Sequence, residues 1–231
     1  MQSELEGALE RVARRATAVT VAGRTDAGVH AWGQVASHDG EPLAARALNA
    51  VLPADLAVIA SEPAPDGWDA RRDATSRAYC YRVLARPERS AWERGRALWH
   101  PRALDRSALA ACAAALPGAH DFTAFTPTDT RHVRFEREVW SAEWRSAGDV
   151  LALWLEADAF MRHMNRVLVG TMLEAAVGIR SVESFVELLD GAPRAAAGPT
   201  APAHGLAFVG VGYGGVPVLG SRAPGASRPE A

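Results

Sequence analysis

A glycine-flanked turn that follows a short β-branched run constrains this chain most. Residues 16–22 carry the pattern of a strand, and the sequence then runs GRTDAGVH over positions 23–30. Glycine allows backbone angles and close approaches that bulkier residues forbid, so Gly23 and Gly28 can form a tight turn around the acid between them. The pattern predicts that Asp26 is held rigidly at a strand end. Taken alone, Asp-Ala-Gly also suits an ordinary turn between two strands.

The turn belongs to a longer string, GRTDAGVHAWGQVASHD over positions 23–39. This string resembles the active-site segment of the TruA-type tRNA pseudouridine synthases, whose pattern is Gly-Arg-Thr-Asp-Ala-Gly-Val-His followed a few residues later by Gln-Val. By this resemblance, Asp26 is the catalytic aspartate. Arg24 is then the neighbouring arginine that helps to bring the target uridine out of its stack.

Further segments are similar to the family in the same order and at the same spacing. They are Trp68–Arg71 leading to Tyr79-Cys80-Tyr81, residues 118–125, residues 159–170, and residues 203–213. The resemblance gives Tyr79 the position of the active-site tyrosine and Arg166 that of the arginine that pairs with the catalytic aspartate. The expected catalytic residues are therefore Asp26, Tyr79 and Arg166, and the expected substrate-binding residues are Arg24, Arg71, Tyr79 and His30.

The N-terminus departs from the family pattern. Members begin with a strand and a loop of the type Tyr-Asp-Gly ending in Gly-Trp-Gln, whereas this chain opens directly on an apolar spacing typical of a helix, carried by Leu5, Ala8, Leu9 and Val12. We expect the first strand of the N-terminal sheet to be missing, either because the start codon is placed late or because the protein is truncated. An alternative function is therefore a catalytically weak RNA-binding remnant of the same family.

The order of the predicted elements indicates an α+β protein with mixed or antiparallel sheets. The pattern predicts helices over 2–14, 42–50, 107–116, 161–178 and 181–190, strands over 16–22, 33–38, 55–62, 76–84, 134–146, 149–158 and 205–213, and a hairpin turn at 147–148. The resemblance implies the pseudouridine synthase fold, two α/β halves with a central cleft. We expect an N-terminal catalytic half over 1–105, a C-terminal half over 106–213 and a disordered tail over 214–231.

The distribution of charge fits RNA better than the net charge does. The formal net charge is −2, yet all 25 basic residues are arginine, the side chain best suited to forked phosphate contacts. Between Arg71 and Arg106 there are ten arginines and four acidic residues, a net charge of +6. We expect RNA contact along part of this stretch, particularly over Arg86–Arg96, although arginine used only for surface solvation is the alternative.

Other composition features bound the partners of the chain. Cys80 and Cys112 form no metal or disulfide spacing, the seven histidines form no metal spacing, and no apolar run is long enough to span a membrane. We therefore expect a cytoplasmic protein with no metal and no membrane association. The resemblance implies tRNA as a partner, a homodimer, and no nucleotide or other cofactor. Most of the tryptophans, Trp92, Trp99, Trp140, Trp144 and Trp154, are expected to be core or interface anchors.

The resemblance implies a specific reaction, the isomerisation of uridine to pseudouridine at positions 38, 39 and 40 in the anticodon stem-loop of tRNA. Asp26 would be the nucleophile at C1′ or at C6, and the sequence does not choose between them. Arg166 would favour the ionised carboxylate, while Tyr79 offers a ring for stacking on uracil and a hydroxyl near the C5 proton. A carboxylate-dependent glycosidase is a third possibility, but its second acid, Asp39 or Asp69, lies in no supporting motif.

Overall fold

The structure, a computed structural model, describes residues 1–130 and 133–220. It divides into a smaller unit of Met1–Arg24 with Gln34–Ala74 and a larger unit of Thr25–Gly33 with the chain from Thr75 onward. The units do not follow the expected boundary at residue 105, because the long strand after Ala74 pairs with strands from the C-terminal part of the chain. Within the described ranges, no helix is both long and apolar enough to cross a membrane.

The smaller unit contains two helices and a two-stranded sheet. Helix α1 (Gln2–Ala13) closely matches the predicted helix and packs with α2 (Ala45–Asn49) through a core of Ala8, Leu9, Val19 and Leu48. Strand β1 (Thr20–Val21) pairs antiparallel with β3 (Ala36–Ser37), and both strands are shorter than expected.

The predicted strand over 55–62 is wrong. Residues 55–62 form no strand, and the backbone there is bonded by a side chain. The amide of Asn49 donates to the Val58 carbonyl (2.8 Å) and accepts from the Val58 N–H (2.7 Å). One amide side chain therefore satisfies both backbone polar groups of Val58 without a neighbouring strand.

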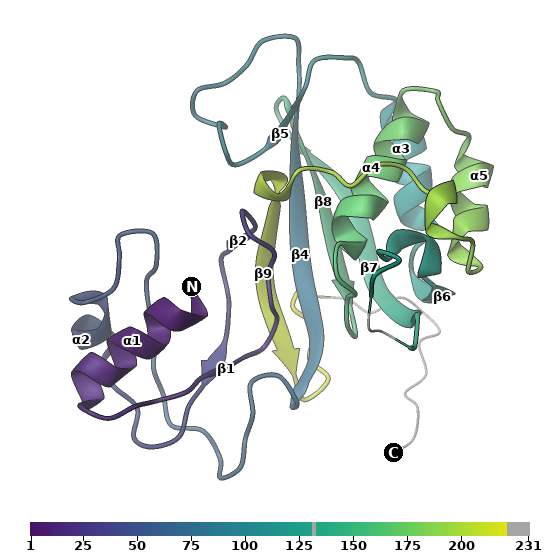
Figure 1. The fold of residues 1–231 in the computed structure, drawn as a ribbon. Helices are drawn as coiled ribbons and strands as arrows, with labels where there is room; N and C mark the ends of the chain where they lie inside the picture. The colour runs from purple at the N-terminus through teal and green to yellow at the C-terminus, as the bar shows by residue number, and fades with distance from the viewer. Residues whose placement is uncertain (131–132, 221–231) are drawn as a thin grey trace. The chain divides into compact units, whose positions relative to one another are not determined.

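The larger unit is built on one seven-stranded sheet in the order β2-β9-β4-β8-β7-β6, with β5 paired to β4 (Figure 1). Pairing is antiparallel along β4-β8-β7-β6 and parallel for β2–β9 and β4–β5, so the sheet is mixed, as the sequence predicts. The predicted hairpin joins β7 to β8, with Gly148 at a positive φ of 60°. The strand bounds are β2 (His30–Ala31), β4 (Ala74–Ala85), β5 (Leu98–His100), β6 (Gly118–Asp121), β7 (Glu136–Ala147), β8 (Val150–Ala157) and β9 (Leu206–Tyr213).

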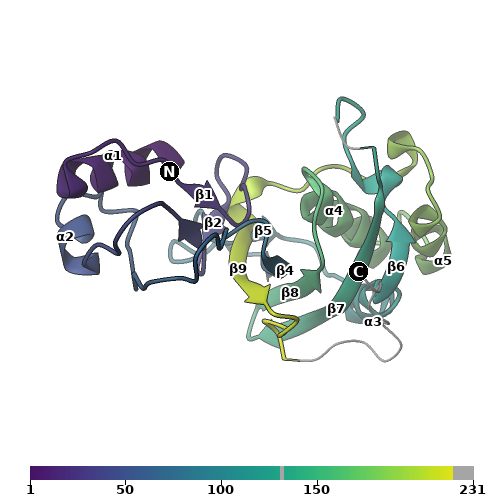
Figure 2. The same ribbon diagram turned by 90° about the horizontal axis from the view of Figure 1, so that it is seen from below.

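Three helices pack together beside the sheet (Figures 1 and 2). They are α3 (Arg106–Ala114), α4 (Met164–Ala176) and α5 (Val182–Val186), which is followed by a 3₁₀ turn over Glu187–Leu189. Alternate residues of a strand share one face, and on β4 and β8 those residues are buried with the apolar residues of α3 and α4. The alternating set is Tyr79, Tyr81, Val83, Leu151, Leu153 and Leu155.

A buried carboxylate fixes the chain after β9. Glu156 is fully buried and accepts hydrogen bonds from the Ser76 hydroxyl (2.6 Å), the Val218 N–H (2.7 Å) and the Leu219 N–H (2.8 Å). Residues 214–220, expected as the start of a disordered tail, are therefore tied to β8. The remainder of that expected tail, 221–231, lies outside the described residues.

Candidate active site

The turn that carries Asp26 leads directly into the edge strand of the larger sheet. The Val29 N–H donates to the Asp26 carbonyl (3.1 Å), and β2 then pairs in parallel with β9. Gly28 has a φ of +83°, which strongly favours glycine. At Gly33 a Cβ atom would lie 2.3 Å from the Val209 carbonyl oxygen, so only glycine fits there without movement of the backbone. Backbone geometry therefore favours glycine at both positions.

Two side chains from the start of α4 reach one oxygen of the Asp26 carboxylate. Arg166 donates through Nη1 to Oδ2 (2.8 Å), and His163 Nε2 lies 3.3 Å from the same oxygen. Arg166 also donates through Nε to the Ala201 carbonyl (2.8 Å), so its guanidinium is held from two sides. Within the described ranges no hydrogen bond reaches Oδ1 of Asp26. The arrangement therefore holds the carboxylate through one oxygen, while the other accepts no hydrogen bond from these residues.

His163 owes its place to an uncommon backbone conformation. It is the residue before the first turn of α4 and has a φ of +64°, in the left-handed region that residues other than glycine seldom adopt. Residues three apart on a helix share a face, so His163 and Arg166 both point toward Asp26. Backbone strain of this kind is concentrated at functional sites. Sequence reasoning did not identify His163 as a partner of Asp26, although its spacing from Arg166 was a usable signal.

Tyr79 is packed in the same unit. Only 8% of the residue is exposed, and its ring lies edge-on to Phe160 and to Phe208, each at a centroid distance of 5.0 Å. Burial raises the pKa of Tyr79 well above its usual value; the charge of Asp26 adds to this, while that of Arg77 opposes it. The phenol therefore stays neutral at ordinary pH.

Beside Tyr79 lies a buried amide whose oxygen has no hydrogen-bond partner among the described residues. Asn165 is 6% exposed, and its Oδ1 accepts no hydrogen bond from the described residues. Together with Tyr79, Tyr81 and Leu206 it lines a narrow gap that is too small for a water molecule. This oxygen is a polar group that α4 places inside an otherwise apolar region.

The other expected substrate-binding residues are divided between the two units. Arg24 and Arg71 belong to the smaller unit, whereas His30 belongs to the larger one. His30 is exposed, and its Nε2 lies 2.7 Å from the Gly95 carbonyl oxygen. The larger unit thus contains Asp26, Arg166 and Tyr79. The smaller unit contains Arg24 and Arg71, two of the residues expected to bind RNA.

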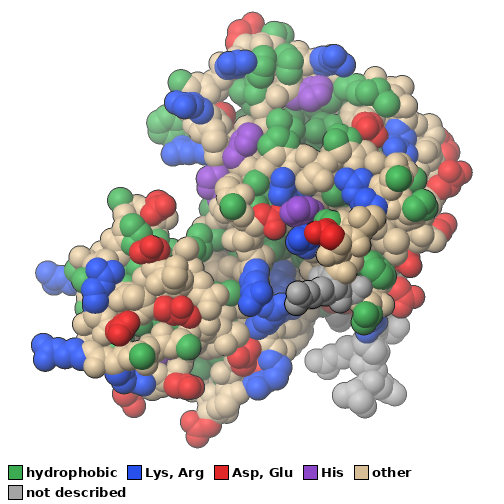
Figure 3. Space-filling model, in the orientation of Figure 1, with side chains coloured by type: hydrophobic (Ala, Val, Ile, Leu, Met, Phe, Trp, Pro, Cys, Tyr) green, Lys and Arg blue, Asp and Glu red, His purple; other side chains and the backbone are tan. Residues whose placement is uncertain are grey.

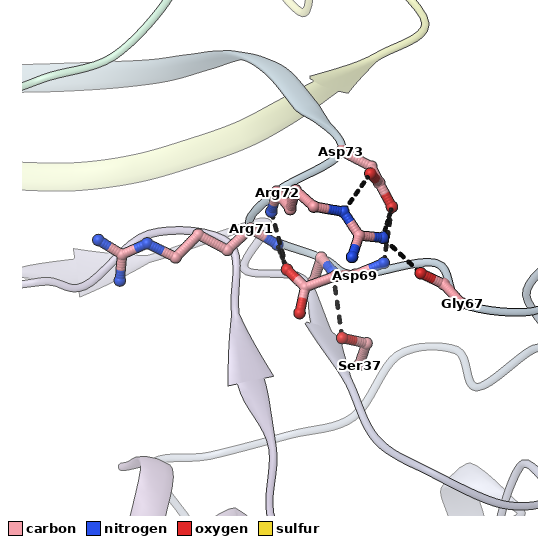
Figure 4. Close-up of polar contacts among 7 residues, drawn as sticks. Ser37, Gly67, Asp69, Arg71, Arg72 and Asp73 are labelled. Atoms are coloured by element: carbon pink, nitrogen blue, oxygen red, sulfur yellow. Dashed lines mark hydrogen bonds and ion pairs between the residues drawn. The ribbon is translucent and has the colours of Figure 1, made fainter.

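The surroundings of Arg71 form a turn stabilised by carboxylates (Figure 4). Asp69 accepts hydrogen bonds from the N–H groups of Arg71 (2.9 Å) and Arg72 (2.8 Å), and the Arg72 guanidinium pairs with Asp73 (3.0 Å). The hydrogen bond from Arg72 is the main cause that lowers the pKa of Asp69. The Arg71 side chain extends away from this cluster in Figure 4. Asp69 therefore stabilises the turn through these hydrogen bonds. It belongs to a different unit from Asp26.

The described residues contain no cluster of three histidine, cysteine, aspartate or glutamate side chains that could hold a metal ion. Cys80 and Cys112 are both buried, and neither is in a disulfide. The chemical groups that converge at Asp26 are a carboxylate, a guanidinium, an imidazole and a nearby neutral phenol.

A carboxylate held by an arginine at the edge of a mixed sheet is typical of an enzyme that uses a carboxylate in catalysis. Comparisons with known proteins specify the class of enzyme. A family model described as tRNA pseudouridine synthase matches residues 112–214. Three relatives named tRNA pseudouridine synthase A are similar along most of this chain. The one from Thermus thermophilus is 44% identical and is aligned over 92% of this chain and 87% of the relative. Those from Myxococcus xanthus and Stenotrophomonas maltophilia are 40% and 38% identical over 92% of this chain, and over 83% and 85% of the relatives. The chain belongs to the tRNA pseudouridine synthase A family, which confirms the resemblance in the sequence.

Proposed function

We propose that this chain isomerises uridine to pseudouridine at positions 38, 39 and 40 in the anticodon stem-loop of tRNA, with Asp26 as the nucleophile. Its family makes it an isomerase that acts on tRNA. The observation that carries the proposal is the carboxylate of Asp26, which Arg166 holds at Oδ2 (2.8 Å) while Oδ1 stays open.

The reaction requires only groups of this kind. The bond from N1 to C1′ breaks, the uracil rotates, and a bond forms between C5 and C1′. The C5 proton leaves and N1 gains a proton, so the reaction has no net redox change. A carboxylate that attacks C1′ or adds to C6 can form the covalent intermediate in either route. Asp26 supplies that carboxylate, and Arg166 and His163 fix its orientation.

Tyr79 has a narrower role than a general base. Because burial raises its pKa, its hydroxyl remains protonated and is a poor acceptor for the C5 proton. The ring is held edge-on between Phe160 and Phe208, which fixes the position of the phenol. We assign Tyr79 to positioning the extruded uracil, by ring contact and by donation from its hydroxyl.

The proposal extends to the partners. The active enzyme is a homodimer in the cytoplasm, and Arg24, Arg71 and His30 contact the tRNA. Arg24 and His30 are exposed, as phosphate contacts require. A weak RNA-binding remnant is the alternative, and the formed Asp26–Arg166 pair favours the active enzyme.

The test is a map of the product. Unmodified tRNAs that carry uridine at only one of the three positions are incubated with the chain, and pseudouridine is located by chemical blocking and primer extension. The proposal predicts a new stop at each position in turn. Modification elsewhere in the tRNA contradicts the assigned site, and a folded chain that binds tRNA but yields no pseudouridine supports the remnant.

A further inference from the structure

The loop between β4 and β5 presents a tryptophan to solvent. Trp92 is 77% exposed, so of the core and interface positions expected for it only an interface position remains, whereas Trp140 is 3% exposed and buried as predicted. The whole loop belongs to the larger unit. In Figure 3, arginine and hydrophobic side chains alternate over this region, at the upper left of the view.

The loop is anchored rather than loosely attached. Arg82 on β4 pairs with Glu93 (2.9 Å), and Arg86 pairs with Asp149 (3.0 Å). The indole N–H of Trp99 donates to the Arg86 carbonyl (3.1 Å). These contacts fix both ends of the loop, so the exposure of Trp92 is imposed by the fold. A large aromatic side chain that is held outward in this way is typical of a binding site.

One arginine lies beside this aromatic side chain, and the same loop carries others. The Arg96 guanidinium lies 5.3 Å from the centre of a Trp92 ring, and the Arg89 guanidinium lies 4.6 Å from that of Trp99. Arg89, Arg94 and Arg96 are exposed, and none of the three pairs with a carboxylate among the described residues. Because one guanidinium covers only one ring face, the other face of Trp92 remains accessible to a flat ligand.

The loop also contacts the catalytic turn. His30, four residues after Asp26, lies with its Nε2 2.7 Å from the carbonyl oxygen of Gly95 in the loop. Both segments belong to the same unit, so the loop lies next to the turn that carries Asp26.

We infer that Trp92 stacks on an unpaired nucleobase of the tRNA, while Arg89, Arg94 and Arg96 bind the adjacent phosphates. The inference rests on tRNA as the substrate. Aromatic side chains combined with cationic groups are the common means of binding single-stranded nucleic acid, since every base has a π face. Trp92 is thus assigned a binding role, stacking on a base, and takes no part in the making or breaking of bonds.

Binding of unmodified tRNA to Asp26→Asn chains tests the inference, because no turnover then occurs during the measurement. Trp92→Ala is expected to weaken binding about 5- to 150-fold with an unchanged salt dependence, and Trp92→Phe to retain most of the affinity. Arg96→Ala is expected to weaken binding and to lower the slope of log affinity against log salt by about one. Ile179→Ala is the matched control, since Ile179 is an exposed apolar residue (70%) outside this loop and should have no effect.

Unchanged affinity in Trp92→Ala overturns the inference, as does an equal loss in Ile179→Ala. The main competing explanation is that Trp92 lies in an interface between protein chains, and sedimentation of the same variants tests it. If Trp92→Ala dissociates a dimer, Trp92 belongs to that interface and the inference is wrong. Failure of the proposed function is distinguishable, because it removes pseudouridine formation by the parent chain, whereas failure here leaves that activity intact.

Discussion

Replacement of Arg166 by methionine is the most informative change at the site. The guanidinium donates to Asp26 Oδ2 and to the Ala201 carbonyl, both at 2.8 Å, and only 16% of the side chain is exposed. Methionine keeps much of the length and the apolar contact but removes both donors. Arg166→Lys keeps the charge, yet a single ammonium group does not reproduce the fork that reaches both acceptors.

The size of the effect follows from these two contacts. A hydrogen bond to a charged group contributes about 1.5–3 kcal/mol, and one between neutral partners about 0.5–1.5 kcal/mol. If the bond to Asp26 holds the carboxylate in its attacking orientation, its loss lowers kcat/KM by about 10- to 150-fold. The bond to Ala201 contributes to folding as well, so a loss of about 0.5–1.5 kcal/mol in the free energy of unfolding accompanies it. Arg166→Lys is expected to lie between the parent and Arg166→Met.

The assay follows the proton at C5. Transfer RNA labelled with tritium at C5 of uridine releases the label to water when the bond from C5 to C1′ forms, so release measures turnover directly. Arg180→Met is the matched control: Arg180 is also 16% exposed, pairs with Glu174 and donates to the Ala196 carbonyl (2.8 Å). Glu174 is eight residues from Arg166, about 12 Å along α4. Turnover within twofold of the parent in folded Arg166→Met, or an equal loss in Arg180→Met, refutes the reasoning.

Two further substitutions and one labelling experiment test the interior of the larger unit. Tyr79→Phe should keep the shape of the pH profile of kcat between about pH 6 and 9, since burial raises the pKa of the Tyr79 hydroxyl above that window; a limb that is lost in the variant contradicts this. Asn165→Leu keeps the branching of the side chain and removes a buried oxygen without a partner, so urea unfolding should show a gain of about 1–2 kcal/mol, and a loss would contradict this expectation. Burial raises the pKa of the Cys80 and Cys112 thiols to about 11, so iodoacetamide at pH 8 should label neither in the native chain and both in urea; native labelling would contradict their burial.

Periodic segments were predictable and short ones were not. Helix α1 and the β7–β8 hairpin follow from apolar spacing and a glycine turn, which are local signals. Residues 55–62 have a strand-like pattern, but the side chain of Asn49 bonds the backbone instead. The three-residue strand β5 pairs with the last three residues of β4, and no local pattern of three residues specifies that partner.

The residues of the candidate site also differ in how far the sequence predicts their positions. The sequence motif indicates Asp26, and the family spacing indicates Arg166 as its partner, which is the contact found at 2.8 Å. His163 reaches Asp26 because tertiary packing imposes a left-handed backbone conformation on it, and side-chain identity does not predict that conformation. The position of Trp92 likewise depends on the anchors of its loop, whereas the sequence alone left a core and an interface position open for it.

The most direct test of the account compares the parent chain with Asp26→Asn in tritium release under single-turnover conditions, with tRNA binding measured on the same preparations. Asparagine preserves the shape of the side chain but is a far weaker nucleophile than a carboxylate. The account predicts full release by the parent and none by Asp26→Asn, although both bind tRNA with affinities within a few-fold. Release by folded Asp26→Asn at a rate near that of the parent would contradict Asp26 as the nucleophile.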